Sequence, residues 1–166
     1  MLAALALAAP ATPSTTTVKA LRSSVSFYRQ ATWRAQSQML APLTHSNRAE
    51  KRSHSVVYLH WLADRWRARA RIARAGNAAF FRRLYAKWAC IHGGEGAWNS
   101  NTGNGYYGGL QMDISFQRSY NGRAVRRYGT ADKWPIREQL IAAERAYKSG
   151  RGFYPWPATA RACGLL

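Results

Sequence analysis

The segment from Glu95 to Gln111 reads EGAWNSNTGNGYYGGLQ and is the most informative part of the chain. It places a single carboxyl group ahead of a run of glycines, asparagines and aromatic residues. A carboxyl group that lies against aromatic rings favours its protonated form, which is the form that a general acid needs. Aromatic faces and amides close to that acid suit stacking against a sugar and hydrogen bonding to it. The stretch therefore indicates an enzyme that acts on a carbohydrate.

Helical patterns flank this stretch on both sides. Glycines at 93 and 94 are expected to end the helix before it, which places Glu95 just beyond a helix C-terminus. After Glu95, the pair Asn104-Gly105 predicts a tight turn, and residues 106–109 form at most a small hairpin arm. Apolar periodicity predicts helices over 78–91, 114–120 and 136–149. We therefore expect a mostly α domain over residues 77–166, with little or no sheet.

The N-terminal half predicts a separate helical unit. Residues 18–39 and 53–75 both carry apolar side chains at alternating steps of three and four, which is typical of amphipathic helices with a packing seam. The short connection around Pro42 favours an antiparallel helical hairpin over residues 18–75. The pair Gly76-Asn77 is expected to end its second helix.

The run NTGNGYYGGLQ at 101–111 resembles the core of the transglycosylase-like domain of actinobacterial resuscitation-promoting factors, a lysozyme-like family. The resemblance extends from about Trp88 to Cys163. It includes the helix segment EQLIAAE at 138–144 and the motif PWP at 155–157. It implies a lysozyme-like catalytic domain that cuts peptidoglycan between N-acetylmuramic acid and N-acetylglucosamine. It implies neither a cofactor nor a metal.

The resemblance places the general acid on Glu95. In the typical family pattern the glutamate directly follows the cysteine, whereas Glu95 lies five positions after Cys90 and three before Trp98. The shorter spacing to the tryptophan resembles the Glu-Ser-x-aromatic arrangement of soluble lytic transglycosylases.

A second carboxylate is available at Asp113. This residue either assists hydrolysis or caps the helix that starts at Ile114. With Asp113 as a cap, the enzyme resembles single-glutamate lytic transglycosylases, in which the muramyl groups of the substrate assist and a 1,6-anhydro product forms. The sequence leaves both routes open.

The family match assigns substrate contacts to Tyr106, Tyr107 and Gln111. Gln139 either projects into the cleft from its helix or lies exposed on the surface. Trp98 either binds substrate or belongs to the core.

Charge suggests what the N-terminal half binds. The chain carries a formal net charge of +18, and residues 1–84 hold 14 Lys and Arg against two acids. Such a field attracts polyanions. We expect the hairpin to favour anionic wall polymers over nucleic acid. An alternative function is a non-catalytic cationic module that binds cell wall or nucleic acid, and in either case we expect a monomer. The arginines of the second helix are Arg65, Arg67, Arg69, Arg71 and Arg74.

Two cysteines, Cys90 and Cys163, bracket the enzyme-like region. A disulfide between them closes a loop of about 74 residues and contributes roughly 4 kcal/mol in the chain-entropy model. The other interpretation is two reduced, buried thiols, and four scattered histidines add no metal site.

A disulfide indicates an exported protein. The apolar segment Met1–Ala9 and the small residues after it lead us to interpret residues 1–17 as a signal remnant or a disordered linker. We therefore expect a secreted or cell-envelope protein without a transmembrane segment.

Overall fold

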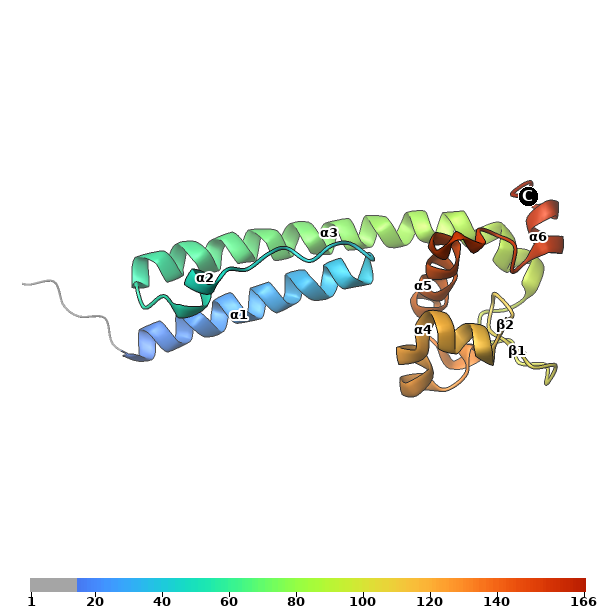
Figure 1. Ribbon diagram of the computed structural model, residues 1–166, viewed down its shortest axis with the longest axis horizontal. Helices are drawn as coiled ribbons and strands as arrows, with labels where there is room; N and C mark the ends of the chain where they lie inside the picture. The colour runs from blue at the N-terminus through green and yellow to red at the C-terminus, as the bar shows by residue number, and fades with distance from the viewer. Residues whose placement is uncertain (1–14) are drawn as a thin grey trace, which may run out of the picture. The chain divides into compact units, whose positions relative to one another are not determined.

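The computed structural model describes residues 15–166, which form helices apart from one small hairpin of strands (Figure 1). The predicted leader at residues 1–14 lies outside the described residues, while residues 15–17 belong to the first helix. The elements are α1 (Thr15–Gln38), α2 (Arg48–Arg52), α3 (Val56–Glu95), β1 (Tyr106–Tyr107), β2 (Met112–Asp113), α4 (Ile114–Tyr128), the 3-10 helix η1 (Ala131–Lys133), α5 (Ile136–Ala146), the π-helix η2 (Tyr147–Arg151) and α6 (Pro157–Ala162). The prediction of a mostly α protein is confirmed.

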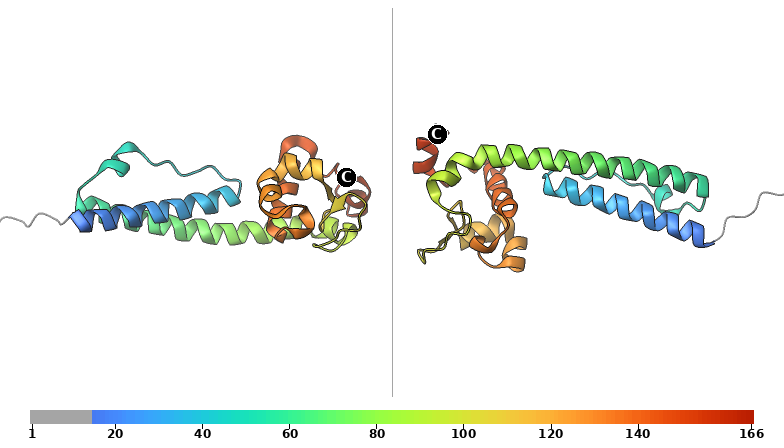
Figure 2. Two further views of the ribbon diagram at one scale, coloured as in Figure 1. Left: turned by 90° about the horizontal axis from the view of Figure 1, so that it is seen from below. Right: turned by 180° about the vertical axis from the view of Figure 1, so that it is seen from behind.

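The chain divides into two compact units, residues 1–77 and residues 78–166. In the first unit, α1 lies beside the first part of α3, which we call the N-terminal helix pair (Figures 1 and 2). Its core is built around the fully buried Trp66, which packs with Val25, Leu62 and Ala63. Trp33 meets Trp66 edge to face, with ring centroids 6.1 Å apart.

The predicted antiparallel course of the helix pair is wrong, because α1 and α3 run parallel. Arg22 near the start of α1 donates to the Ser53 carbonyl at 2.8 Å, just before α3. At the other end, the Asn77 amide donates to the Gln38 side chain at 2.7 Å. The connection between the helices, residues 39–55, returns along their length and is held there by side chains. The Trp33 indole donates to the Thr44 carbonyl at 2.8 Å, and the Gln36 amide bonds the same residue.

The predicted helix break at Gly76-Asn77 is also wrong, because α3 continues to Glu95. Gly76 packs beside Met39, and a Cβ there would lie 3.5 Å from the Met39 sulfur, which is an ordinary packing distance. The Asn77 side chain is engaged by Gln38 and does not cap a new helix. The pair Gly93-Gly94 likewise lies inside α3, so Glu95 is the last residue of the helix, not a residue beyond it.

The second unit surrounds the buried Trp88 with aromatic rings. The centroids of Phe153 and Trp156 lie 5.1 and 5.0 Å from that of Trp88. The strands β1 and β2 pair antiparallel, Tyr106 with Asp113 and Tyr107 with Met112. This core fixes the end of α3 against the small hairpin.

Two helix boundaries in this unit differ from the predicted ones. The helix α4 runs on to Tyr128, past a non-helical Asn121 (φ −152°, ψ 51°). The Asn121 amide donates to the Glu138 carbonyl and carboxylate at 3.1 and 2.9 Å, which holds the kink in place. The α-helical geometry of α5 ends at Ala146, and the segment Tyr147–Arg151 forms a π-helix.

Candidate active site

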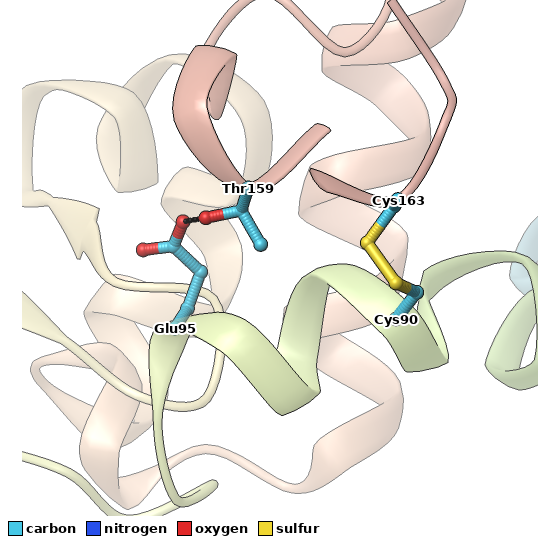
Figure 3. The surroundings of a disulfide bond; sticks show 4 residues. All are labelled: Cys90, Glu95, Thr159 and Cys163. Carbon is cyan, nitrogen blue, oxygen red and sulfur yellow. Dashed lines mark hydrogen bonds between the residues drawn. A yellow bond between two sulfur atoms is a disulfide. The ribbon is translucent and has the colours of Figure 1, made fainter. Parts of the chain in front are cut away.

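The proposed acid, Glu95, lies half-buried at the end of α3. The Thr159 hydroxyl, from α6, donates a hydrogen bond to Glu95 Oε1 (Figure 3). Figure 3 shows the second carboxylate oxygen pointing away from Thr159, and this oxygen has no hydrogen-bond partner within residues 15–166. One oxygen of Glu95 is therefore held, and the other is available to a ligand.

A disulfide joins α3 to the end of α6, the two segments that carry Glu95 and Thr159. Cys90, on α3, is bonded to Cys163, which directly follows α6, with their Cα atoms 6.0 Å apart (Figure 3). The predicted disulfide is confirmed. Because it joins α3 to the end of α6, it keeps Thr159 close to Glu95.

The glycines of the loop between β1 and β2 lie where side chains would collide. A Cβ on Gly109 would lie 2.6 Å from the Trp98 ring and 2.7 Å from the His92 ring. Gly108 has a φ of +75°, and a Cβ there would lie 3.1 Å from the Ala131 carbonyl. Gln111 itself adopts a left-handed conformation with φ 44°, which is uncommon for a residue with a side chain. Its amide donates to the Gly108 carbonyl at 2.8 Å. The sequence GGLQ therefore forms a tight, close-packed turn.

Gln139 does not lie where either sequence-based interpretation placed it. Its side chain is 0% exposed, so it is neither a surface glutamine nor open to a substrate. Its Oε1 accepts from the Gly109 amide at 2.9 Å, and its Nε2 donates to the Trp98 carbonyl at 2.8 Å. Gln139 thus stabilises the glycine loop through buried hydrogen bonds to the Gly109 amide and the Trp98 carbonyl.

Trp98 also packs against the residues that hold the glycine loop. Its ring stacks on His92, with centroids 3.9 Å apart and an interplanar angle of 21°. His92 Nδ1 lies 3.1 Å from the Gly109 carbonyl oxygen. Trp98 is half-buried in this stack, so only part of its surface can meet a ligand.

A cavity of about 250 Å³ opens beside the loop. Three of the predicted site residues line it, namely Tyr106, Gln111 and Asp113, and Tyr106 is 47% exposed. Glu95 is not among the lining residues. Gln111 packs beside the residue that follows Glu95, because its Nε2 lies 3.7 Å from where a Cβ on Gly96 would be. Tyr107 is half-buried and does not line the cavity.

Further polar side chains line the cavity. They include Tyr120 and Arg151, whose guanidinium lies 5.9 Å from the Phe116 ring centroid. Hydrogen bonds from Ser149 and then Arg151 lower the pKa of Tyr120 below its ordinary value. The cavity therefore offers hydrogen-bonding groups and aromatic faces together, as a site for a hydroxylated ligand requires.

Asp113 caps a helix, one of its two predicted roles. Its Oδ1 accepts from the Phe116 amide at 2.7 Å, and its backbone is extended, as is usual for an N-cap. It also lines the cavity.

Sequence reasoning missed three residues that build the site. Thr159 bonds Glu95, the Trp156 indole donates to the Leu110 carbonyl at 2.6 Å, and the buried Gln117 donates to the Met112 carbonyl at 2.7 Å. The motif PWP marked the position of Trp156, but no local pattern marks Thr159 or Gln117.

Within residues 15–166, no group of three His, Cys, Asp or Glu side chains is arranged to hold a metal ion. None of the helices described is both long and apolar enough to cross a membrane.

The geometry defines a mostly α domain with one glutamate at a helix end and a glycine-rich hairpin in the same unit. Comparison with known proteins shows what this domain is similar to. A family model described as a transglycosylase-like domain matches residues 86–159. Those residues resemble the transglycosylase-like domain of resuscitation-promoting factors.

Three curated relatives match part of the chain. Resuscitation-promoting factor Rpf1 of Corynebacterium glutamicum is 40% identical over 76 residues, which cover 46% of this chain and 37% of that protein. RpfE of Mycobacterium tuberculosis is 38% identical over 72 residues, covering 43% and 37%. RpfB of Mycolicibacterium smegmatis is 37% identical over 68 residues, covering 41% and 17%. The chain thus spans little more than a third of these relatives at most. No solved structure matches it.

Proposed function

We propose that this protein cleaves the glycan strands of peptidoglycan, with Glu95 as the general acid. The observation that carries the proposal is the environment of the Glu95 carboxyl group. One oxygen is held by Thr159, and the other points away from that hydroxyl (Figure 3). The family match over residues 86–159 supports the substrate class.

The other acids of residues 78–166 are less suited to the role. The Glu144 carboxylate is buried, 2.9 Å from the Lys87 ammonium. The Glu138 carboxylate accepts from Asn121 at 2.9 Å, and Asp132 has a buried oxygen. Asp113 caps α4. Glu95 is thus the acid that lies at a helix end with one carboxylate oxygen held and the other without a hydrogen-bond partner within residues 15–166.

The proposed reaction begins when the Glu95 carboxyl gives its proton to the glycosidic oxygen. The bond from the anomeric carbon to that oxygen breaks, the departing sugar keeps the oxygen as a hydroxyl, and an oxocarbenium-like centre forms. The Thr159 hydroxyl stabilises the carboxylate left on Glu95 through its hydrogen bond.

Capture of that centre decides the product. Because Asp113 Oδ1 is occupied by the Phe116 amide, we favour a single-carboxylate route. The substrate's own C6 hydroxyl attacks the anomeric carbon and returns its proton to Glu95, which gives a 1,6-anhydro sugar. Mass spectrometry distinguishes this product, because it is lighter by one water than the product of hydrolysis.

The cavity residues supply the proposed sugar contacts. The exposed ring of Tyr106 can stack against a pyranose, and Gln111 and Asp113 can bond its hydroxyl groups. Tyr107 and Trp98 contribute smaller partly exposed surfaces. Peptidoglycan lies outside the cytoplasm, so the proposal includes action at the cell envelope.

The variant Glu95→Gln tests the proposal, because an amide cannot donate the proton. We expect lytic activity on purified walls to fall by about 10²–10⁴-fold with the fold retained. Asp64→Asn, which removes an exposed acid from the N-terminal helix pair, is the matched control and should clear wall suspensions like the wild type.

Two results would change the assignment. Wild-type clearing by Glu95→Gln would exclude Glu95 as the acid. If the wild type binds walls without clearing them, the protein is a binding module. Asp113→Asn should retain most of the activity, and its loss with an intact fold would favour the two-carboxylate hydrolysis instead.

A further inference from the structure

A second apolar face runs along α3, away from the core of the N-terminal helix pair. The face that packs against α1 includes Leu59, Leu62 and Trp66. At 3.6 residues per turn, a different set of residues lines the opposite side. We call the apolar members of this set the outer strip, namely Val57, Trp61, Ala68, Ile72 and Ala75, and the exposed Asp64 lies between Trp61 and Ala68 on the same side.

The large side chains of the outer strip are unusually open to solvent. Val57 is 81% exposed, Ile72 is 69% exposed and Trp61 is 50% exposed. Isolated exposed apolar residues are common, but an aligned row of them marks a surface that binds something. The long helix is therefore apolar on two sides, and only one side is used by the fold of the pair.

Arginines border the outer strip along both edges. By helical position, Arg65 lies on one edge, and Arg71 and Arg74 lie on the other. Arg67 and Arg69 lean toward the core instead, because their guanidinium groups lie 5.2 Å from the Tyr28 ring centroid and 4.7 Å from the Trp66 ring centroid, respectively. The Arg65 guanidinium lies 4.9 Å from the Trp61 ring centroid, so it covers one end of the strip.

Few of these charges are neutralised. Arg67 pairs with Asp64 at 3.0 Å, and Asp64 is the single acid on this face of α3. Arg71 and Arg74 are exposed and have no acidic partner within the described residues. Residues 17–77 as a whole hold 12 Lys and Arg against Asp64 and the buried Glu50.

We propose that the outer strip docks onto an anionic lipid surface, with α3 lying in the plane of the interface. An interfacial helix places apolar side chains at the boundary between headgroups and acyl chains, while flanking cations meet the anionic headgroups. The outer strip supplies the first requirement and the bordering arginines supply the second.

The arrangement fits a lipid surface better than the other candidate partners. A hydrated wall polymer would satisfy the arginines, but it would leave Val57 and Ile72 in water. A second copy of the same strip would cover the apolar residues, but it would bring two sets of arginines together. An anionic lipid surface satisfies both parts of the face.

The test is co-sedimentation of the full chain with vesicles of phosphatidylglycerol and phosphatidylcholine, compared with vesicles of phosphatidylcholine alone. The wild type should bind the mixed vesicles at moderate salt and bind the neutral vesicles weakly. The combined substitution Val57→Gln, Trp61→Gln and Ile72→Gln keeps every charge and introduces a good helix former. It should weaken binding at least tenfold, because three apolar side chains no longer enter the interface.

Two further variants separate the contributions. Phe27→Gln removes an apolar side chain of α1 that is 61% exposed and should leave binding unchanged. The combined substitution Arg71→Gln and Arg74→Gln keeps the outer strip. It should weaken binding to mixed vesicles roughly 25-fold, at about fivefold for each cation near the surface.

Circular dichroism establishes that each variant keeps its helix content. If the triple variant loses helix, Ile72→Gln alone replaces it, with a smaller decrease expected. The proposal is overturned if the strip variant binds mixed vesicles like the wild type. It is also overturned if the wild type sediments with purified walls but not with vesicles. A concentration-dependent mass in sedimentation velocity that the strip variant abolishes would assign the strip to self-association and would equally overturn it.

Discussion

Each unit of the molecule buries one tryptophan whose indole donates a hydrogen bond to a glutamate. In the N-terminal helix pair, Trp66 donates to Glu50 Oε2 at 3.3 Å, and in the second unit Trp88 donates to Glu144 Oε2 at 3.3 Å. The partners of the two carboxylates differ. The Ser46 hydroxyl donates to Glu50 at 3.0 Å, whereas the Lys87 ammonium lies 2.9 Å from Glu144.

This difference reflects what each unit has to hold in place. The helix pair packs regular helices, and its apolar seam accounts for most of its core. The second unit also holds an irregular loop, and it buries polar side chains to bond that loop, among them Gln117, Asn121 and Gln139. Buried amides that bond backbone groups of a loop are costly to disturb, because their partners are then left unsatisfied. The second unit thus depends on specific polar contacts, and the helix pair depends on apolar packing.

The largest expected effect that separates the two units comes from reduction of the disulfide. Cys90 and Cys163 are 73 positions apart and both lie in the second unit. Reduction should cost that unit about 4 kcal/mol, because the unfolded chain regains loop entropy. Hydrogen exchange with and without reductant should then show faster exchange in peptides from α5 and α6 and unchanged exchange in α1.

Equal acceleration in α1 would show that the two units unfold together, and the comparison would fail. The double variant Cys90→Ser and Cys163→Ser is the control. Added reductant should have no effect on it.

The next largest effect is the difference in stability loss between variants of the two buried carboxylates, Glu144 and Glu50. Glu144→Gln leaves the Lys87 ammonium, which lies 3.2 Å from the Tyr147 ring centroid, without its carboxylate partner. We expect a loss of about 2 kcal/mol in the free energy of unfolding. Glu50→Gln keeps an oxygen that accepts from Trp66 and Ser46, so its loss should stay below about 1 kcal/mol. Urea unfolding followed by tryptophan fluorescence measures both, and equal losses would remove the distinction between the units.

The sequence predicted the parts of the fold that depend on local pattern. Periodicity identified the buried sides of α1 and α3, and the glycine-rich segment indicated a small hairpin near residues 106–109. The turn that joins β1 to β2 lies at residues 108–111, after the predicted Asn104-Gly105 turn. The sequence could not predict the direction of the helix pair, because a buried stripe is the same whether its partner runs parallel or antiparallel. The parallel course depends on bonds such as that from the Trp33 indole to the Thr44 carbonyl, which no spacing rule foresees.

The site shows the same limit. Glu95 and the glycine loop are contiguous in sequence, so a motif could identify them. The predicted positions of Gln139, in the cleft or on the surface, were wrong because its role depends on a loop 30 residues away. Its Oε1 accepts a hydrogen bond from the Gly109 amide of that loop. Thr159 was missed because it lies 64 residues from Glu95 and reaches it through the packing of α6 against α3.

The smallest expected effect concerns that contact between Thr159 and Glu95. Thr159→Val keeps the shape of the side chain and removes the hydroxyl that donates to Glu95 Oε1. Stability should change little, because a valine methyl also fills the space beside Gly94, where the Thr159 methyl packs closely. Since a hydrogen bond to a charged group is worth about 1.5 kcal/mol or somewhat more, turnover on soluble glycan fragments should fall by roughly tenfold. KM should stay near its wild-type value, because the hydroxyl bonds the acid and not the sugar. Thr159→Ser keeps the donor and loses the methyl group, so it should restore turnover and cost a little stability instead. If the serine variant were as slow as the valine variant, packing of α6 would be what matters for Glu95, and the hydroxyl would have no part in positioning the acid.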